Sequence, residues 1–185
     1  GQIGDHSWDE LSSVTVAGQD RIPLMSELLA AFPDAVFNID IKADPATDPL
    51  AAMLAGSGDA PRVCVGSFSS ARLARFRALA PDVLTSASKL EVARYVFGFG
   101  VRRDPFGAGE VLQVPTRAFG GLVGVVRPDV VAAAHAHHRA VQVWTIDNPT
   151  EMARLIDLGV DGLITNDLVA LKQVLRNRGL WQEEL

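Results

Sequence analysis

The feature that most constrains the fold of this chain is a repeated change in the period of its apolar residues. Short apolar runs of strand length alternate with longer stretches of helical spacing along the whole sequence. This alternation predicts β-α-β units and a parallel sheet. The six expected strands lie near residues 36–41, 63–66, 83–86, 111–114, 141–145 and 161–165.

The stretches between these strands carry helix-end signals. Asn148 is expected to cap a helix, Pro149 to occupy its first position and Gly159 to end it. The polar, poorly patterned stretch 102–110 is expected to be a surface loop. Further helices are expected within residues 21–33, 48–58, 69–81, 89–100, 127–140 and 167–179.

Two architectures fit this pattern: an open doubly wound sheet and a (β/α)8 barrel that shows about six of its eight units. No G-x-G-x-x-G follows a strand and no G-x-x-x-x-G-K-[ST] occurs, which disfavours a nucleotide-binding open sheet. The 185 residues are enough for one core, so we expect a single domain spanning 1–185.

Composition excludes some functions. The net charge of −5 argues against binding to nucleic acid, which requires a basic face. Cys64 is the only cysteine and is expected to be a small buried residue, because no feature nearby would activate its thiol. No apolar run reaches the roughly 18 residues that a membrane span needs.

The carboxyl ends of the strands are where a parallel α/β protein places its active site. In "VFNIDIKAD", residues two apart share a strand face, so Asn38, Asp40 and Lys42 should point the same way. One interpretation is an ion pair between Asp40 and Lys42, or a solvated strand end. The other is a metal-ligating carboxylate beside a phosphate-binding lysine.

Residues at other strand ends are also candidates for ligand binding, and each has an ordinary structural explanation as well. Ser67 could bind a ligand or belong to a helix cap, and Trp144 could wall a pocket or lie in the core. Among the four histidines, His135, His137 and His138 lie at the C-terminal end of an expected helix, where a solvated face is the default interpretation and a metal cluster is the alternative. No histidine follows a strand, so no general base is evident.

Several segments together resemble the glycerophosphodiester phosphodiesterase family, whose members are (β/α)8 barrels. "RIPLMSELLAAFP", "FNIDIK", "VGSF" and "LQVP" are each similar to a family segment. "VQVWTIDNPTEMARLIDLGVDGLITND" is similar to the family's closing segment almost without interruption. The ordered set is specific, although each single piece is not.

The resemblance implies hydrolysis of a glycerophosphodiester, a small-molecule substrate, to an alcohol and glycerol 3-phosphate. It also implies a divalent metal, Mg or Ca, held by three carboxylates, and two histidines that transfer protons. Asp40 matches one of the metal ligands and Lys42 the catalytic lysine near the phosphate. Phe68 and Trp144 match positions that wall the substrate pocket.

The chain departs from the family pattern in two ways. The family usually has Glu at the position of Asp40, and Asn at that of Asp147. Its opening H-R-G, E-N-T, E-x-D and H-D segments do not occur here. We therefore expect the catalytic histidines upstream of Gly1, and no hydrolysis by these residues alone.

Two other functions remain open from the sequence. The chain could be a non-catalytic barrel that binds a partner or ligand. It could also belong to a related phosphodiesterase that acts on another phospholipid-derived diester.

Overall fold

The computed structural model describes residues 3–98, 111–118 and 120–182. The chain divides into two compact units, Gly1–Phe37 and Asn38–Leu185, which are described separately. The expectation of a single domain stays a prediction. The expected loop at 102–110 lies outside the described residues.

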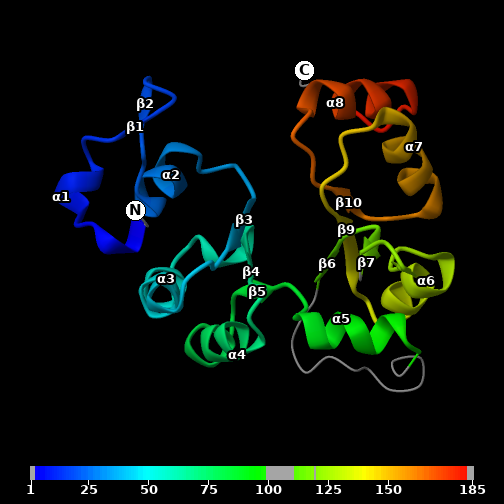
Figure 1. Ribbon diagram of the computed structural model, residues 1–185, viewed down its shortest axis with the longest axis horizontal. Coiled ribbons are helices and arrows are strands. Elements are labelled where there is room, and N and C mark those ends of the chain that lie inside the picture. The colour runs from blue at the N-terminus through cyan, green and yellow to red at the C-terminus, as the bar shows by residue number, and fades with distance from the viewer. Residues whose placement is uncertain (1–2, 99–110, 119, 183–185) are drawn as a thin grey trace. The chain divides into compact units, whose positions relative to one another are not determined.

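The first unit is made of short elements (Figure 1). Ser7 begins α1 because its side chain accepts from the backbone N–H of Glu10, whose carboxylate accepts from the Ser7 backbone N–H. The strands β1 and β2 pair antiparallel. The elements are a 3-10 turn at Ile3–Asp5, α1 at Trp8–Leu11, β1 at Thr15–Val16, β2 at Asp20–Arg21 and α2 at Met25–Ala31.

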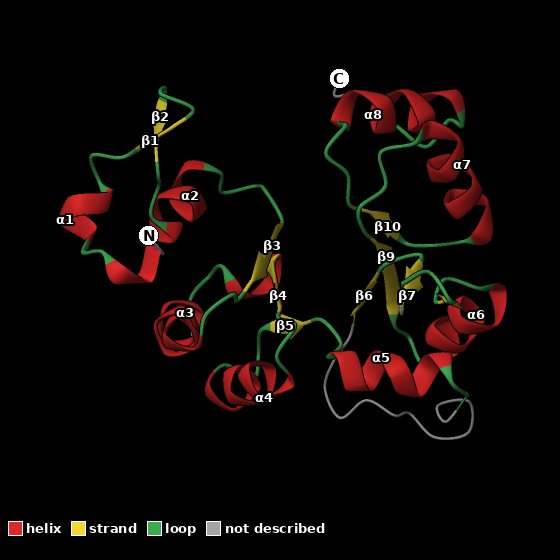
Figure 2. Ribbon diagram, in the orientation of Figure 1, coloured by secondary structure: helices red, strands yellow, loops and turns green. Residues whose placement is uncertain are grey.

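The main strands of the chain confirm the six predicted positions (Figure 2). They form the orders β3-β4-β5 and β6-β9-β10, and the parallel bridge between Ser86 and Val111 joins the end of β5 to β6. The pairs β4–β5, β6–β9 and β9–β10 are parallel. The bounds are β3 Phe37–Asp40, β4 Val63–Gly66, β5 Leu84–Thr85, β6 Val111–Val114, β9 Ala140–Val143 and β10 Gly162–Leu163.

Helices connect these strands at the predicted places. Ser69, Ser88 and Asp167 cap α4, α5 and α8 with their side chains. The predicted caps of α7 are also confirmed, with Asn148 before it and Gly159 after it at a φ of 90°. The bounds are α3 Thr47–Leu54, α4 Ser70–Leu79, α5 Lys89–Val96, α6 Pro128–Ala136, α7 Pro149–Leu158 and α8 Leu168–Asn177.

Short elements were missed by the sequence analysis. The strands β7 Arg117–Ala118 and β8 Val123–Gly124 pair as an antiparallel hairpin. Single turns of 3-10 helix also lie at Asp44–Ala46 and Ala60–Arg62.

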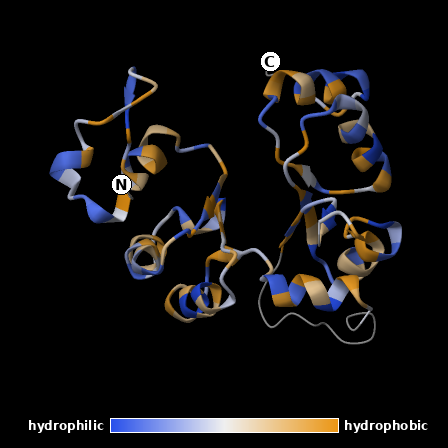
Figure 3. Ribbon diagram, in the orientation of Figure 1, coloured by the Kyte–Doolittle hydropathy of each residue, from blue (hydrophilic) through white to orange (hydrophobic). Residues whose placement is uncertain are grey.

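The second unit has a core built on strand alternation. Leu112 and Val114 on β6 lie beside Val141 and Val143 on β9, and all four are buried. The apolar faces of α7 and α8 pack over this core, while polar residues occupy their other faces (Figure 3). Every residue of β4 is buried, Cys64 included, as expected. In the described ranges, no helix combines the length and apolar character required to cross a membrane.

Candidate active site

A pocket of about 620 Å³ opens at the carboxyl ends of the strands in the second unit. One part of its wall is polar and comes from the strand ends, and another part is apolar and comes from α5 and the β7–β8 hairpin. The polar lining residues are Asn38, Asp40, Lys42, Ser67, Ser86, Lys89, Gln113 and Thr145. The apolar ones include Phe68, Val92, Ala93, Val96, Phe97, Val114, Pro115, Val123, Val125 and Trp144.

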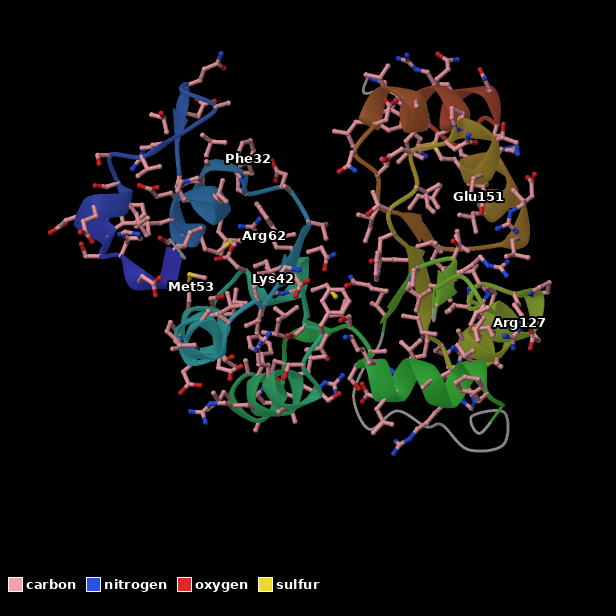
Figure 4. The ribbon with its side chains drawn as sticks, in the orientation of Figure 1. Phe32, Lys42, Met53, Arg62, Arg127 and Glu151 are labelled. Atoms are coloured by element: carbon pink, nitrogen blue, oxygen red, sulfur yellow. The ribbon has the colours of Figure 1, made fainter. Side chains whose placement is uncertain are left out.

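Asp40 ends β3 and Lys42 lies two residues beyond it (Figure 4). Their side chains form an ion pair between Lys42 Nζ and Asp40 Oδ2. The side chains are 72% exposed for Lys42 and 36% for Asp40, so the pair lies in solvent and contributes at most about 1 kcal/mol to stability. A ligand can therefore replace either partner at small energetic cost.

Phe68 follows β4 and forms an aromatic wall with Trp144, which follows β9. The two ring centroids are 5.8 Å apart, with the planes at 87°. Two ammonium groups lie over the Phe68 ring: Lys42 Nζ at 5.2 Å and Lys89 Nζ at 5.0 Å from its centroid. Such cation–aromatic contacts contribute about 0.5–1 kcal/mol at exposed sites, so they favour conformations that keep both ammonium groups at the pocket.

Side-chain amides also connect the strands to one another. Gln113 Nε2 donates to Asn38 Oδ1 at 2.9 Å and to Gln142 Oε1 at 3.0 Å. Gln113 thus links β3, β6 and β9 through side chains. A Cβ at Gly66 would lie 3.0 Å from Ser86 Oγ and 3.1 Å from Gln113 Oε1, so a larger residue here would force these two side chains to shift.

A partly buried ion pair fixes the end of β5 and the start of α5. The Arg77 guanidinium on α4 donates to both carboxylate oxygens of Glu91, at 3.0 and 3.2 Å, and also to Thr85 Oγ1 and the Ser86 carbonyl. Burial raises the pKa of Glu91, but the hydrogen bonds from Arg77 and the Ser88 backbone outweigh it and hold that pKa below its ordinary value. This network sets where Ser86 and Lys89 enter the pocket.

The Ser67 side chain forms a hydrogen bond with the backbone in the structure. Its hydroxyl donates to the Ile41 carbonyl at 2.8 Å and accepts from Arg72 Nη1 at 3.2 Å. Arg72 also donates to the Ile41 carbonyl and pairs with Asp44. Ser67 therefore ties the end of β4 to the chain that follows β3.

Asp147 joins the ends of β9 and β10. Its carboxylate accepts from the Thr165 hydroxyl at 2.9 Å and from the Asn166 backbone N–H at 2.8 Å. These hydrogen bonds, the one from the Asn166 backbone most of all, lower the pKa of Asp147 below its usual range. Asp147 is thus a loop-bracing residue, and it does not line the described pocket.

The three histidines of α6 and its C-terminal turn do not line the described pocket. His135 Nε2 lies 2.9 Å from Asp161 Oδ2, which also accepts from the Val141 backbone N–H. The His137 ring meets the Tyr95 ring edge to face at 6.1 Å. His135 and Asp161 thus connect α6 to the amino ends of β9 and β10.

Candidate metal ligands are few among the described residues of the pocket. Within the described ranges, no group of three His, Cys, Asp or Glu side chains is arranged to hold a metal ion. Asp40 is the one carboxylate among the described residues that line the pocket. Asp40 has suitable oxygen ligands for Mg²⁺ or Ca²⁺, but one carboxylate does not complete a site.

All four residues singled out by the sequence, Asp40, Lys42, Phe68 and Trp144, line the same pocket. The predicted shared face of Asn38, Asp40 and Lys42 is confirmed, since all three line it. Sequence reasoning missed Lys89. Its position four residues after the end of β5, as the first residue of α5, is the signal that could have identified it.

The sequence matches the model of the glycerophosphoryl diester phosphodiesterase family over residues 1–170. A relative from Mycobacterium tuberculosis named "Probable glycerophosphodiester phosphodiesterase 2" is 32% identical, over 98% of this chain and 70% of its own length. "Glycerophosphodiester phosphodiesterase GDPD4" of Arabidopsis thaliana is 28% identical, over 90% of this chain and 52% of its own length.

Solved structures agree with the fold. A glycerophosphodiester phosphodiesterase from Parabacteroides distasonis superposes with a TM-score of 0.70 and 20% identity, over 94% of this chain and 72% of that one. The fold is thus of the (β/α)8-barrel class, and the six main strands of the described residues agree with the predicted partial barrel. The chain belongs to the glycerophosphodiester phosphodiesterase family. It spans about half to three quarters of the length of these relatives.

Proposed function

We propose that this chain provides the phosphodiester-binding pocket of an enzyme that hydrolyses glycerophosphodiesters to an alcohol and glycerol 3-phosphate. Membership of the family supports this reaction class. The observation that carries the proposal is the position of Lys42 in one pocket with Phe68 and Trp144. These are the residues that the family resemblance assigns to phosphate and substrate.

Lys42 stabilises the phosphate in this proposal. Its present partner, Asp40, is exposed, so exchanging that ion pair for a diester phosphate costs little. A lysine ammonium acts as a point charge on phosphoryl oxygens, and it contributes most where negative charge grows in the transition state. Lys42 thus orients the phosphate and lowers the energy of the transition state.

Phe68 and Trp144 bind the carbon skeleton of the substrate. Their edge-to-face arrangement presents apolar ring surface beside the polar strand ends. Apolar walls with a few placed polar groups are typical of small-molecule sites. The glycerol and alcohol parts lie against these rings, and bulk water is partly excluded from the phosphate.

Asp40 is proposed as one ligand of a divalent cation, Mg²⁺ or Ca²⁺. When bound, such a cation polarises phosphoryl oxygens. The remaining ligands must come from outside the described residues, since these hold no group of three candidate ligands. Asp40 has a shorter side chain than the Glu usual in the family, so we expect a weaker metal site than a Glu variant would give.

The proton-transferring histidines are proposed to lie outside this chain, in the family's H-R-G and H-D segments. No histidine is present among the described residues that line the pocket. A full-length protein that joins this chain to those segments would be the active enzyme. The 185 residues alone would release no glycerol 3-phosphate.

The function is tested by glycerol 3-phosphate release from glycerophosphoglycerol by the full-length protein and its Lys42→Met variant. We expect kcat/KM to fall by about 100-fold or more, since one transition-state charge contact is lost. The control is Lys172→Met, because Lys172 lies over the Trp181 ring and does not line the described pocket. An active Lys42→Met enzyme would refute the assignment, and an inactive wild type would favour a non-catalytic binding barrel.

The metal is tested separately by calorimetric titration of the full-length protein with Mg²⁺ and Ca²⁺. Asp40→Asn should weaken cation binding by at least about tenfold, because a ligating carboxylate is lost. Asp157→Asn removes a carboxylate that pairs with Arg178 on the helices away from the described pocket, so it should leave the affinity unchanged. Equal affinity in wild type and Asp40→Asn would exclude Asp40 as a ligand.

A further inference from the structure

Lys89 is a second cation at the pocket, and hydrogen bonds on either side of it fix its backbone. It is the first residue of α5, directly after Ser88, whose hydroxyl accepts from the backbone N–H of Glu91. Glu91 in turn accepts from the Ser88 backbone and from Arg77. The backbone that carries Lys89 is therefore braced by a cap and an ion pair.

The charge of Lys89 is not balanced by the described part of the chain. Lys42 pairs with Asp40, whereas no carboxylate forms an ion pair with Lys89 within residues 3–98, 111–118 and 120–182. Its ammonium lies over Phe68, and both line the pocket. The charged groups among the described lining residues are Asp40, Lys42 and Lys89, so they sum to one positive charge.

The local placement of Lys89 is unfavourable for the helix. A cation in the first turn faces the positive end of the helix dipole, and the amino ends of helices favour acidic residues instead. Helix stability thus gives no reason for lysine at this position. Such a conflict between local preference and sequence is typical of functional positions.

The two lysines change what the aromatic wall can recognise. An aromatic ring with a free face attracts a quaternary ammonium, such as that of choline. Here the Phe68 ring already has two ammonium groups over it, at 5.0 and 5.2 Å. A cationic alcohol placed beside this ring would be repelled by both ammonium groups.

We propose that Lys89 is a specificity-determining residue that selects glycerophosphodiesters whose alcohol carries no positive charge, over those with a cationic alcohol. This proposal rests on the proposed hydrolytic function and specifies the class of substrate that the enzyme prefers. Neutral alcohols, such as glycerol or inositol, fit the positive wall, and so do anionic alcohols. Choline and ethanolamine do not.

The test compares kcat/KM for glycerophosphoglycerol and glycerophosphocholine in the full-length protein and three variants. Wild type should prefer glycerophosphoglycerol, and Lys89→Met should reduce that preference about three- to tenfold, mainly through a lower KM for glycerophosphocholine. Lys89→Arg, which keeps the charge, and Lys172→Met, which removes a charge elsewhere, should both retain the wild-type preference.

The outcomes separate the two proposals. If wild type hydrolyses both diesters and Lys89→Met leaves their ratio unchanged, the role of Lys89 is refuted while the hydrolytic function stands. A wild-type preference for glycerophosphocholine would refute it as well. If neither diester is hydrolysed, the proposed function fails and the selectivity fails with it.

Discussion

Glu91→Gln tests how the pocket is held together. The substitution keeps the shape of the side chain but removes the charge that Arg77 faces. The two side chains are largely buried, at 11% exposed for Glu91 and 18% for Arg77. Arg77 would keep its hydrogen bonds to Thr85 and the Ser86 carbonyl but lose its counter-charge.

The expected cost follows from these contacts. Two charge-assisted hydrogen bonds join Arg77 to Glu91, and a third joins Glu91 to the Ser88 backbone. Each hydrogen bond to a charged group contributes roughly 1.5–3 kcal/mol. A glutamine oxygen in the place of Glu91 Oε2 still accepts two of the three, from the Ser88 backbone and from Arg77 Nη2. Leaving a largely buried arginine unpaired adds to the loss. We expect Glu91→Gln to lower the free energy of unfolding by about 2–4 kcal/mol.

The pH dependence has a definite sign. The pKa of Glu91 is lower in the folded chain than its ordinary value of 4.5. Its stabilising contribution is therefore complete above that ordinary value and is lost as the pH falls through the lowered folded pKa. The stability difference between wild type and Glu91→Gln should be constant near neutral pH and should shrink in acid, below about pH 4.5.

Urea unfolding followed by circular dichroism at several pH values measures this difference. The matched control is Glu151→Gln, which removes the partner of Arg154 from an exposed ion pair, with side chains 33% and 51% exposed. That control should cost less than about 1 kcal/mol. If the two variants lose equal stability, or if the Glu91→Gln difference persists in acid, the reasoning about the network is wrong.

Two further substitutions, with Gly58→Ala as a control, test local geometry. Gly66→Ala should lower stability by about 1–3 kcal/mol, because the new methyl group would press on Ser86 and Gln113, whereas Gly58→Ala meets no neighbouring atom and should be nearly neutral. Asn148→Ala removes a side chain that accepts from two backbone N–H groups of α7 and should cost about 1 kcal/mol. Thermal unfolding measures all three, and equal Tm values for the two glycine variants would contradict the close approach at Gly66.

The main strands and helices were predictable because their signals are local. Apolar period, Pro149 at a helix start and Gly159 at its end act within a few residues, so the sequence shows them directly. The β7–β8 hairpin was not predictable in the same way. Its strands are two residues each, too short to show an alternating pattern.

The candidate site was predictable only where one strand end carried several polar residues. Asp40 and Lys42 stand two apart, so a single rule about strand faces placed them together. Lys89 was not predicted because its proposed role depends on its contact with Phe68, which follows a different strand. The contact of Gln113 with Asn38 was missed for the same reason, since it joins strands that are far apart in sequence.

The most direct test of the central claim is release of glycerol 3-phosphate from glycerophosphoglycerol, measured for the full-length protein, its Asp40→Asn variant and the 185-residue chain. The account predicts release by the full-length protein that stops on chelation of divalent cations, a strong loss in Asp40→Asn, and none from the chain alone. Release that continues undiminished in Asp40→Asn, or metal-dependent release by the 185 residues alone, would contradict it.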